Sequence, residues 1–286
     1  MSVDVTPSPT RPAGVRWRIV GSPTRWLTYG VLVFFLTMLA GTVGSVLLSS
    51  FATRWFATWT PEGYTTKWYG QSWEEFDLTS VLVVTAEVAI AVVLISLLIA
   101  VPAAYALARR DFPGKRLVMV LFLLPVVVPT ITYGVPLAIL FYDLHLALTL
   151  PGVVLINLVP AVPFAILILV PFVEQIDVSL EKAARVFGAG QFRIFARIVF
   201  PLLVPGLVAV SVLLLVRTLA LFDLTFFVAG PEQTTLVVKL FAAVSGAGFR
   251  VDQSVDAMAV IYMAANVALL AVALKFINPS RLVSAG

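Results

Sequence analysis

The run SVLVVTAEVAIAVVLISLLIAVPAAYALA occupies residues 80–108 and contains a single charged side chain, Glu87. A helix of about 20 mostly apolar residues crosses the ~30 Å hydrocarbon core of a membrane, so this run predicts a membrane-spanning helix. Continuous apolar runs are typical of membrane helices, whereas membrane barrels have alternating ones. We therefore predict an all-α integral membrane protein with six transmembrane helices. The other five runs cover residues 26–51, 117–142, 150–172, 202–222 and 257–277.

The composition of the whole chain excludes a soluble domain. Of its 286 residues, 60% are apolar and 12% are charged, and the mean hydropathy is +1.03. Soluble domains are about 45–50% apolar and about 25% charged. Disordered chains need the opposite balance. The chain has no cysteine, which excludes disulfide bonds and thiolate metal sites.

The lysines and arginines indicate which ends of the spans face the cytoplasm. Of the 19 basic residues, 14 fall in the N-terminal tail, in the connections after the second and fourth spans, and near the C-terminus. With six spans these segments share one side, and an excess of positive charge marks the cytoplasmic side. We therefore predict that both termini are cytoplasmic. Residues 1–25, rich in Pro, Ser, Thr and Arg, are predicted to be a disordered cytoplasmic tail, and residues 26–286 a transmembrane domain.

Two longer connections are expected on the opposite side. Residues 52–79 contain four tryptophans, which indicate either anchoring at the membrane interface or a docking surface for an external partner. The connection at 223–256 has apolar stretches too short to span a membrane, and we interpret it as a re-entrant or interfacial segment.

The chain lacks the residues that most catalytic chemistry needs. His145 is the only histidine, so neither a histidine metal cluster nor a Ser-His-Asp triad is expected. No phosphate-binding glycine loop is present, which predicts that the chain does not hydrolyse nucleotides itself. We expect no catalytic residue, no metal and no cofactor in this chain, and no nucleic-acid partner.

The connection after the fourth span, residues 174–200, has a distinctive pattern. The part that reads LEKAARVFGAGQ starts at Leu180 and suits a short helix. Ala184 and Gly188 are four residues apart and share a helix face, where small side chains permit close approach of another backbone. Gly188 and Gly190 are positioned to end this helix and turn the chain into a second one. A surface helix resting on the bilayer is the alternative. Three phenylalanines are expected to anchor the turn: Phe187, Phe192 and Phe195.

This connection resembles the cytoplasmic "EAA" loop of permease subunits in binding-protein-dependent ABC importers. That pattern is E-A-A, three residues, G, nine residues and I-x-L-P. Here Ala183 and Ala184 precede Gly188 at the right spacing, and Ile198 to Pro201 completes the pattern. There are two departures from the pattern. Lys182 occupies the usual glutamate position, with Glu181 beside it, and Phe200 replaces the usual leucine.

The resemblance extends over about residues 80–277. Residues 103–114 are similar to the end of the second span in these permeases, and residues 225–239, with the external residues 54–56 and 61–65, resemble the spermidine/putrescine branch. It implies a permease subunit in a bacterial inner membrane, surrounded by lipid. The partners it implies are two ATPase subunits that hold ATP and Mg, a second permease subunit of a different chain, and an extracytoplasmic solute-binding protein. The ATPase-coupling residues that it implies are Glu181, Lys182, Ala183, Ala184, Gly188 and Gly190.

Four residues in or near the spans are candidates for the solute path. Ionisable groups within a membrane are costly and usually functional, which singles out Glu87 and Asp223. A polyamine would use carboxylates and aromatic faces, so Tyr133 and Phe222 join them. The alternative role is hydrogen bonding between helices. Arg217 is a third ionisable residue, but it is six positions from Asp223 and so does not share its helix face.

Other functions stay open at this point. A permease for a sugar or polyol shares much of the same framework as one for a polyamine. An ion-coupled secondary transporter would need a coupling site beside broken helices in repeated halves, and no convincing internal repeat is present. A membrane scaffold without transport activity would leave residues 174–200 unexplained.

Overall fold

The computed structural model describes residues 23–55, 58, 60–246 and 252–276. Most of the predicted tail and the C-terminal Arg281 lie outside these residues. The chain divides into two compact units, Met1–Ser45 and Val46–Gly286. Helices dominate both, and within the described residues the one β pairing is an isolated bridge between Ala52 and Tyr64.

Helix α1 (Pro23–Phe51) begins in the first unit and ends in the second. Residues 25–43 are all exposed, and the helix is apolar on every side, which is typical of a membrane span. At its C-terminal end, within the second unit, the buried Ser50 shares a 2.8 Å hydrogen bond with Tyr69 of α2 (Lys67–Glu75). The predicted span at 26–51 is therefore a helix, as expected.

The centre of the second unit is α3 (Leu78–Arg109), which packs against α6 (Leu150–Glu174) and α9 (Phe200–Ala220). Both α3 and α6 bury alanines in the same core, and small side chains of this kind let helices approach closely in a membrane. These alanines are Ala100, Ala104, Ala161 and Ala165. The apolar runs predicted at 80–108, 150–172 and 202–222 are thus the packed core of the protein.

The third predicted span is not one straight helix. Residues 117–142 are divided between α4 (Lys115–Val127) and α5 (Thr130–Asp143), and the two helices are bent by 96°. Pro129 causes the break: proline has no N–H to donate and disfavours the helical conformation at Val128, which is extended (φ −70°, ψ 132°). The described residues thus contain five helices that could cross a membrane, or six if the bent pair forms one span.

The fifth span is longer than predicted. Helix α8 (Gln191–Ile194), a π-helical turn (Phe195–Val199) and α9 form a continuous helix of 30 residues, from Gln191 to Ala220. It is followed by two short helices, α10 (Asp223–Val228) and α11 (Leu236–Ser245), with a 3₁₀ turn between them. The last span is α12 (Asp252–Phe276).

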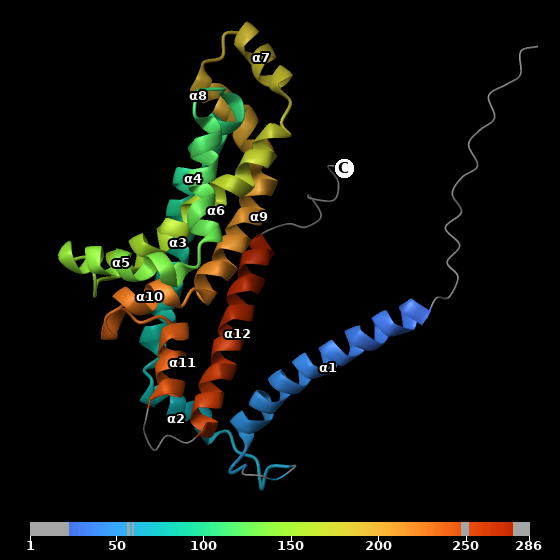
Figure 1. Ribbon diagram of the computed structural model, residues 1–286, viewed down its shortest axis with the longest axis vertical. Helices are drawn as coiled ribbons and strands as arrows, with labels where there is room; N and C mark the ends of the chain where they lie inside the picture. Colours follow the sequence, from blue (N-terminus) through green and yellow to red (C-terminus); the bar gives the residue numbers. More distant parts are fainter. Residues whose placement is uncertain (1–22, 56–57, 59, 247–251, 277–286) are drawn as a thin grey trace, which may run out of the picture. The chain divides into compact units, whose positions relative to one another are not determined.

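The two groups of connections lie at opposite ends of the second unit. Figure 1 shows α8 at one end, next to α7 (Val178–Val186), and α2 with the start of α12 at the other. α12 packs on α2, α9 and α11, and α10 packs on α5 and α6. The structure therefore separates residues 174–200 from residues 52–79, as the six-span prediction requires.

Candidate functional site

Helix α7 starts and stops where its sequence dictates. The Asp177 carboxylate accepts a hydrogen bond from the backbone N–H of Ser179 at 2.8 Å and so caps the first turn. Gly188 ends the helix with a φ of +81°, a conformation that favours glycine. Gly190 then immediately precedes α8. The predicted helix, turn and second helix are confirmed.

The hydrogen bond to Asp177 affects its ionisation. Two hydrogen bonds from Ser179 lower the pKa of the Asp177 carboxyl below its ordinary value of 3.8. The bond from the backbone N–H has the larger effect, and the bond from the hydroxyl has the smaller one. The positive charges of Arg109 and Lys182 lower the pKa further. The cap is therefore charged at neutral pH, which suits the N-terminus of a helix.

A buried ion pair ties α7 to the end of α3. The Glu181 side chain is 3% exposed, and its Oε1 accepts a hydrogen bond from Arg109 Nε at 2.7 Å. Its Oε2 accepts one from the Tyr105 hydroxyl at 2.6 Å. Arg109 also donates to the carbonyl of Ile176 at 2.6 Å. Three segments, α3, the end of α6 and α7, are thus held together by one carboxylate and one guanidinium.

The ion pair uses Glu181 and not position 182. Lys182 and Ala183 are exposed, whereas Ala184 is half-buried against the core. Although Lys182 replaces the glutamate of the family pattern, the carboxylate of Glu181, one residue earlier, forms the ion pair with Arg109. Sequence reasoning missed Tyr105 and Arg109 as its partners, because both are more than 70 positions away.

The phenylalanines of the turn behave differently from the prediction. Phe195 does anchor the turn, with its ring 5.4 Å from that of Tyr105 in an edge-on arrangement. Phe187 and Phe192 are 90% and 84% exposed, so the prediction that they anchor the turn is wrong. Val186 is 84% exposed as well. A Cβ added at Gly188 would meet nothing within 4 Å. This end of the protein thus presents an open apolar surface, formed by Val186, Phe187, Gly188 and Phe192.

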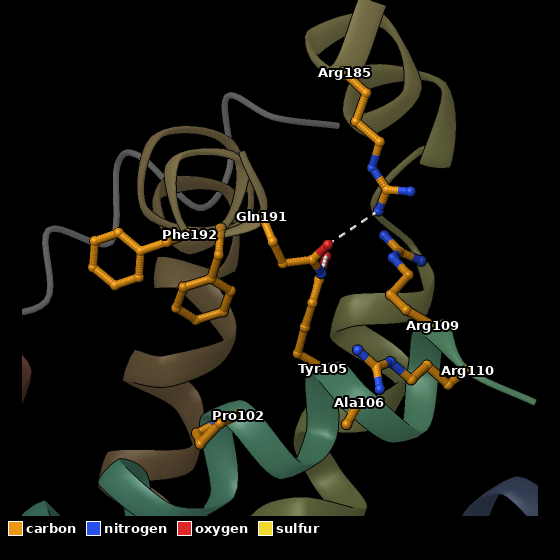
Figure 2. Close-up of a pocket in the computed structure, with 9 residues that line it drawn as sticks. Pro102, Tyr105, Ala106, Arg109, Arg110, Arg185, Gln191 and Phe192 are labelled. Atoms are coloured by element: carbon orange, nitrogen blue, oxygen red, sulfur yellow. Dashed lines mark hydrogen bonds between the residues drawn. The ribbon is translucent and has the colours of Figure 1, made fainter. Parts of the chain in front are cut away.

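Beside this surface, an open hollow of about 720 Å³ lies between α3 and α8. Figure 2 shows three arginines, Arg109, Arg110 and Arg185, gathered at one side of it, with Phe192 at the other. Arg185 donates a long hydrogen bond of 3.4 Å to Gln191, drawn as a dashed line. Gln191 in turn donates to the Tyr105 hydroxyl at 3.3 Å. The hollow is therefore basic along one wall and apolar along another.

Three of the four candidate path residues lie in the region of α5, α10 and α11. Asp223, at the start of α10, accepts a hydrogen bond from the Thr130 hydroxyl at the start of α5. Tyr133 donates to the carbonyl of Pro125 at 3.3 Å and is close enough to Asp223 to interact electrostatically. Phe222 stacks on Phe226 at 5.0 Å. In this region the described residues therefore place a carboxylate, a phenol and a stack of rings together.

Glu87 does not join this group through any described hydrogen bond or ion pair. It is exposed on α3, on a stripe whose other members are apolar. Those members are Val83, Ile90, Leu94 and Leu98.

Two further polar residues belong to this region. The guanidinium of Arg217 lies 4.8 Å from the centre of the Phe164 ring, a cation–π contact, and within electrostatic range of Tyr133. Within the described part of the chain it forms no salt bridge with Asp223. Asn157 is 1% exposed and donates to Thr225 at 3.0 Å, and its Oδ1 has no hydrogen-bond partner. Sequence reasoning missed Asn157, although a lone amide in an apolar run is a signal that could have found it.

The sequence of the chain matches a known protein family. Residues 99–282 match the family described as "Binding-protein-dependent transport system inner membrane component". The chain is 32% identical over 169 residues to the diacetylchitobiose uptake system permease protein NgcG of Streptomyces coelicolor, covering 59% of this chain and 54% of NgcG. It is 32% identical over 172 residues to the molybdenum transport system permease protein ModB of Haemophilus influenzae, covering 54% of this chain and 75% of ModB.

A solved structure shares the fold. A chain of a bacterial ABC transporter involved in the import of the acidic polysaccharide alginate superimposes with a TM-score of 0.72 at 18% identity, over 94% of this chain and all of that one. The chain under study therefore spans about half the length of NgcG, three quarters of ModB and the whole of the alginate transporter chain.

Proposed function

The chain belongs to the family of binding-protein-dependent transport system inner membrane components, and from this premise we propose that it is a permease subunit of an ATP-driven importer. It lines one side of the path for a small solute that an extracytoplasmic binding protein delivers. A second permease subunit of a different chain completes the path. Two ATPase subunits bind ATP and Mg and drive the cycle from the cytoplasm. The membrane is the bacterial inner membrane.

The observation that carries this proposal is the construction of α7. The surface beside it exposes Val186 at the end of α7, Phe187 just after it and Phe192 of α8, which a chain acting alone would bury or avoid. The inner surface of α7 is locked to α3 by the Glu181–Arg109 pair. A helix that offers an apolar surface to a partner and is rigidly joined to the spans transmits the partner's motion into the membrane. The ATPase subunit is the partner whose motion this helix receives.

For the solute, we propose a neutral, hydroxyl-rich molecule such as a sugar. Sugars stack their apolar faces on aromatic rings, and Phe222, Phe226 and Phe241 offer such rings. Arg217 and Asp223 act on Tyr133 with opposite sign, so this region carries charges of both signs and not a single excess charge. The similarity to NgcG supports the same class.

A polyamine-like solute is the second candidate. The Asp223 carboxylate beside aromatic rings is the feature that favours a cation. The Arg217 guanidinium opposes it, because like charges repel within the same region. Uptake of a labelled disaccharide and of labelled spermidine by cells that express the complete transporter distinguishes the two.

The test of the coupling function is a charge placed on the exposed surface of α7. Phe187→Glu should leave the fold intact, since the side chain touches little within the chain. Docking would then bury an unpaired carboxylate, so co-purification of the ATPase subunits and solute uptake should both fall steeply. The control is Tyr64→Glu, an equally drastic change at a 68% exposed aromatic residue at the opposite end of the second unit.

Two results would contradict the proposal. One is normal ATPase co-purification and uptake with Phe187→Glu. The other is robust ATP hydrolysis by the purified chain alone, because the described function places hydrolysis in separate subunits.

A further inference from the structure

The arginines of the hollow carry more positive charge than the protein itself balances. Glu181 pairs with Arg109. Among the described residues, neither Arg110 nor Arg185 has a carboxylate within salt-bridge distance, and the nearby Asp111 is paired with Lys115 at 3.2 Å. Arg185 has only its 3.4 Å contact with the Gln191 amide. Two guanidinium groups are therefore available to an anion.

The shape of the hollow suits a headgroup that is attached to something apolar. Its basic wall comes from Arg109 and Arg110 at the end of α3 and from Arg185 of α7 (Figure 2). Pro102 and Phe195 also line it, and the same two residues line an apolar groove of about 440 Å³ between α3 and α9. The hollow and the groove therefore lie side by side at Pro102 and Phe195.

The groove continues along α3 in the direction away from the arginines. Leu94 lines both this groove and the next one, of about 290 Å³, which reaches Ile90. From Pro102 to Ile90 is a rise of about 18 Å along a helix. Nearly all the side chains that line the two grooves are apolar, with Ser211 the one polar residue. An unbranched hydrocarbon chain fits a groove of this length and chemistry.

We propose that an anionic phospholipid of the cytoplasmic leaflet occupies this site, with its phosphate between Arg110 and Arg185 and one acyl chain in the groove between α3 and α9. Basic pockets between membrane helices on the cytoplasmic side recognise such headgroups. A free phosphate would use the arginines and leave the groove empty, and the position of the groove directly beside the arginine-lined hollow favours the lipid. The assignment rests on the proposed orientation, in which residue 109 faces the cytoplasm, and not on the identity of the solute.

The test is native mass spectrometry of the full-length chain, purified in mild detergent and supplied with either phosphatidylglycerol or phosphatidylcholine. Phosphatidylglycerol should be retained and phosphatidylcholine lost. Arg110→Gln with Arg185→Gln should weaken retention by about 25-fold, because each basic residue near anionic lipid contributes roughly fivefold. Arg193→Gln with Arg197→Gln removes the same charge from exposed positions outside the hollow and should change nothing.

A second pair of variants tests the groove. Leu98→Trp fills it and should also release phosphatidylglycerol, whereas Ile99→Trp, next to it but outside the lining, should not. Competition by inorganic phosphate with no effect of Leu98→Trp would show a free phosphate site and overturn the lipid. Retention of phosphatidylglycerol by the double arginine variant would also overturn it. So would loss of the lipid once the partner permease is bound, because the groove would then be a protein interface.

Discussion

Replacing Glu181 by alanine should release α7 from the end of α3. The change leaves the Arg109 guanidinium, whose side chain is 10% exposed, without its counter-ion, and leaves the Tyr105 hydroxyl without its acceptor. Breaking a buried ion pair by removing one partner costs about 3–5 kcal/mol. Because Arg109 keeps its bond to the Ile176 carbonyl, we expect the lower end, about 3 kcal/mol, which is roughly a 100-fold change in an opening equilibrium.

Hydrogen exchange measures this opening directly. In the purified full-length chain, the backbone amides of residues 178–186 should exchange about 100-fold faster in the Glu181→Ala variant. The amides in the middle of α6 should be unaffected. Lys182→Ala is the matched control, since that side chain is exposed, and should leave exchange unchanged.

A double variant separates the ion pair from simple loss of packing. Glu181→Leu with Arg109→Leu removes both charges, so no buried charge stays unpaired, and exchange should return part of the way to the native rate. Unchanged exchange in Glu181→Ala, or equal acceleration by Lys182→Ala, would refute the reasoning.

Three other outcomes concern the end of α7, its cap and the orientation of the chain. Gly188→Ala should destabilise the end of α7 by about 1–2 kcal/mol, because alanine disfavours the left-handed conformation that Gly188 adopts. Gly190→Ala is the control and should not destabilise it, because Gly190 has a φ of −70°. Thermal unfolding should therefore show a lower unfolding temperature for Gly188→Ala only. The Ser179 bonds lower the pKa of Asp177, so the stabilisation by this cap is fully present above pH 3.8 and is lost as the pH falls through the lowered pKa. Hydrogen exchange of the first α7 amides, corrected for the intrinsic pH dependence of exchange, should become faster over that range. A cysteine at Gly70 should react with an impermeant thiol reagent in intact cells and one at Gly190 should not; the reverse would overturn the orientation.

The spans could be predicted because their signal is local. Each apolar run is long enough to require a membrane or a core, and that requirement does not depend on what the run packs against. The turn after α7 was equally local, since Gly188 ends the helix through its own left-handed backbone conformation. Pro129 lies within the third predicted span, but a proline permits either a kink or a break. The 96° bend, and the packing of α5 on α10, could therefore not be predicted from the sequence.

The candidate site was less predictable because its members are distant in sequence. Glu181 finds Tyr105 and Arg109 through the packing of α3, which no spacing along the chain reveals. The exposure of Phe187 and Phe192 was also hidden, since an apolar residue in a loop looks the same whether its own chain or another protein covers it.

The unbroken helix from Gln191 to Ala220 makes a lever out of the fifth span. At 1.5 Å per residue its 30 residues form a rod about 45 Å long. A tilt of about 5° about the π-helical turn at Phe195–Val199 would displace Ala220, about 35 Å away, by about 3 Å. The π-helical turn at Phe195–Val199 interrupts the regular α-helical winding of this rod, so it is where a bend would be expected. If α7 moves and carries α8 with it, the long arm of this rod would turn a small movement there into a larger one near Asp223.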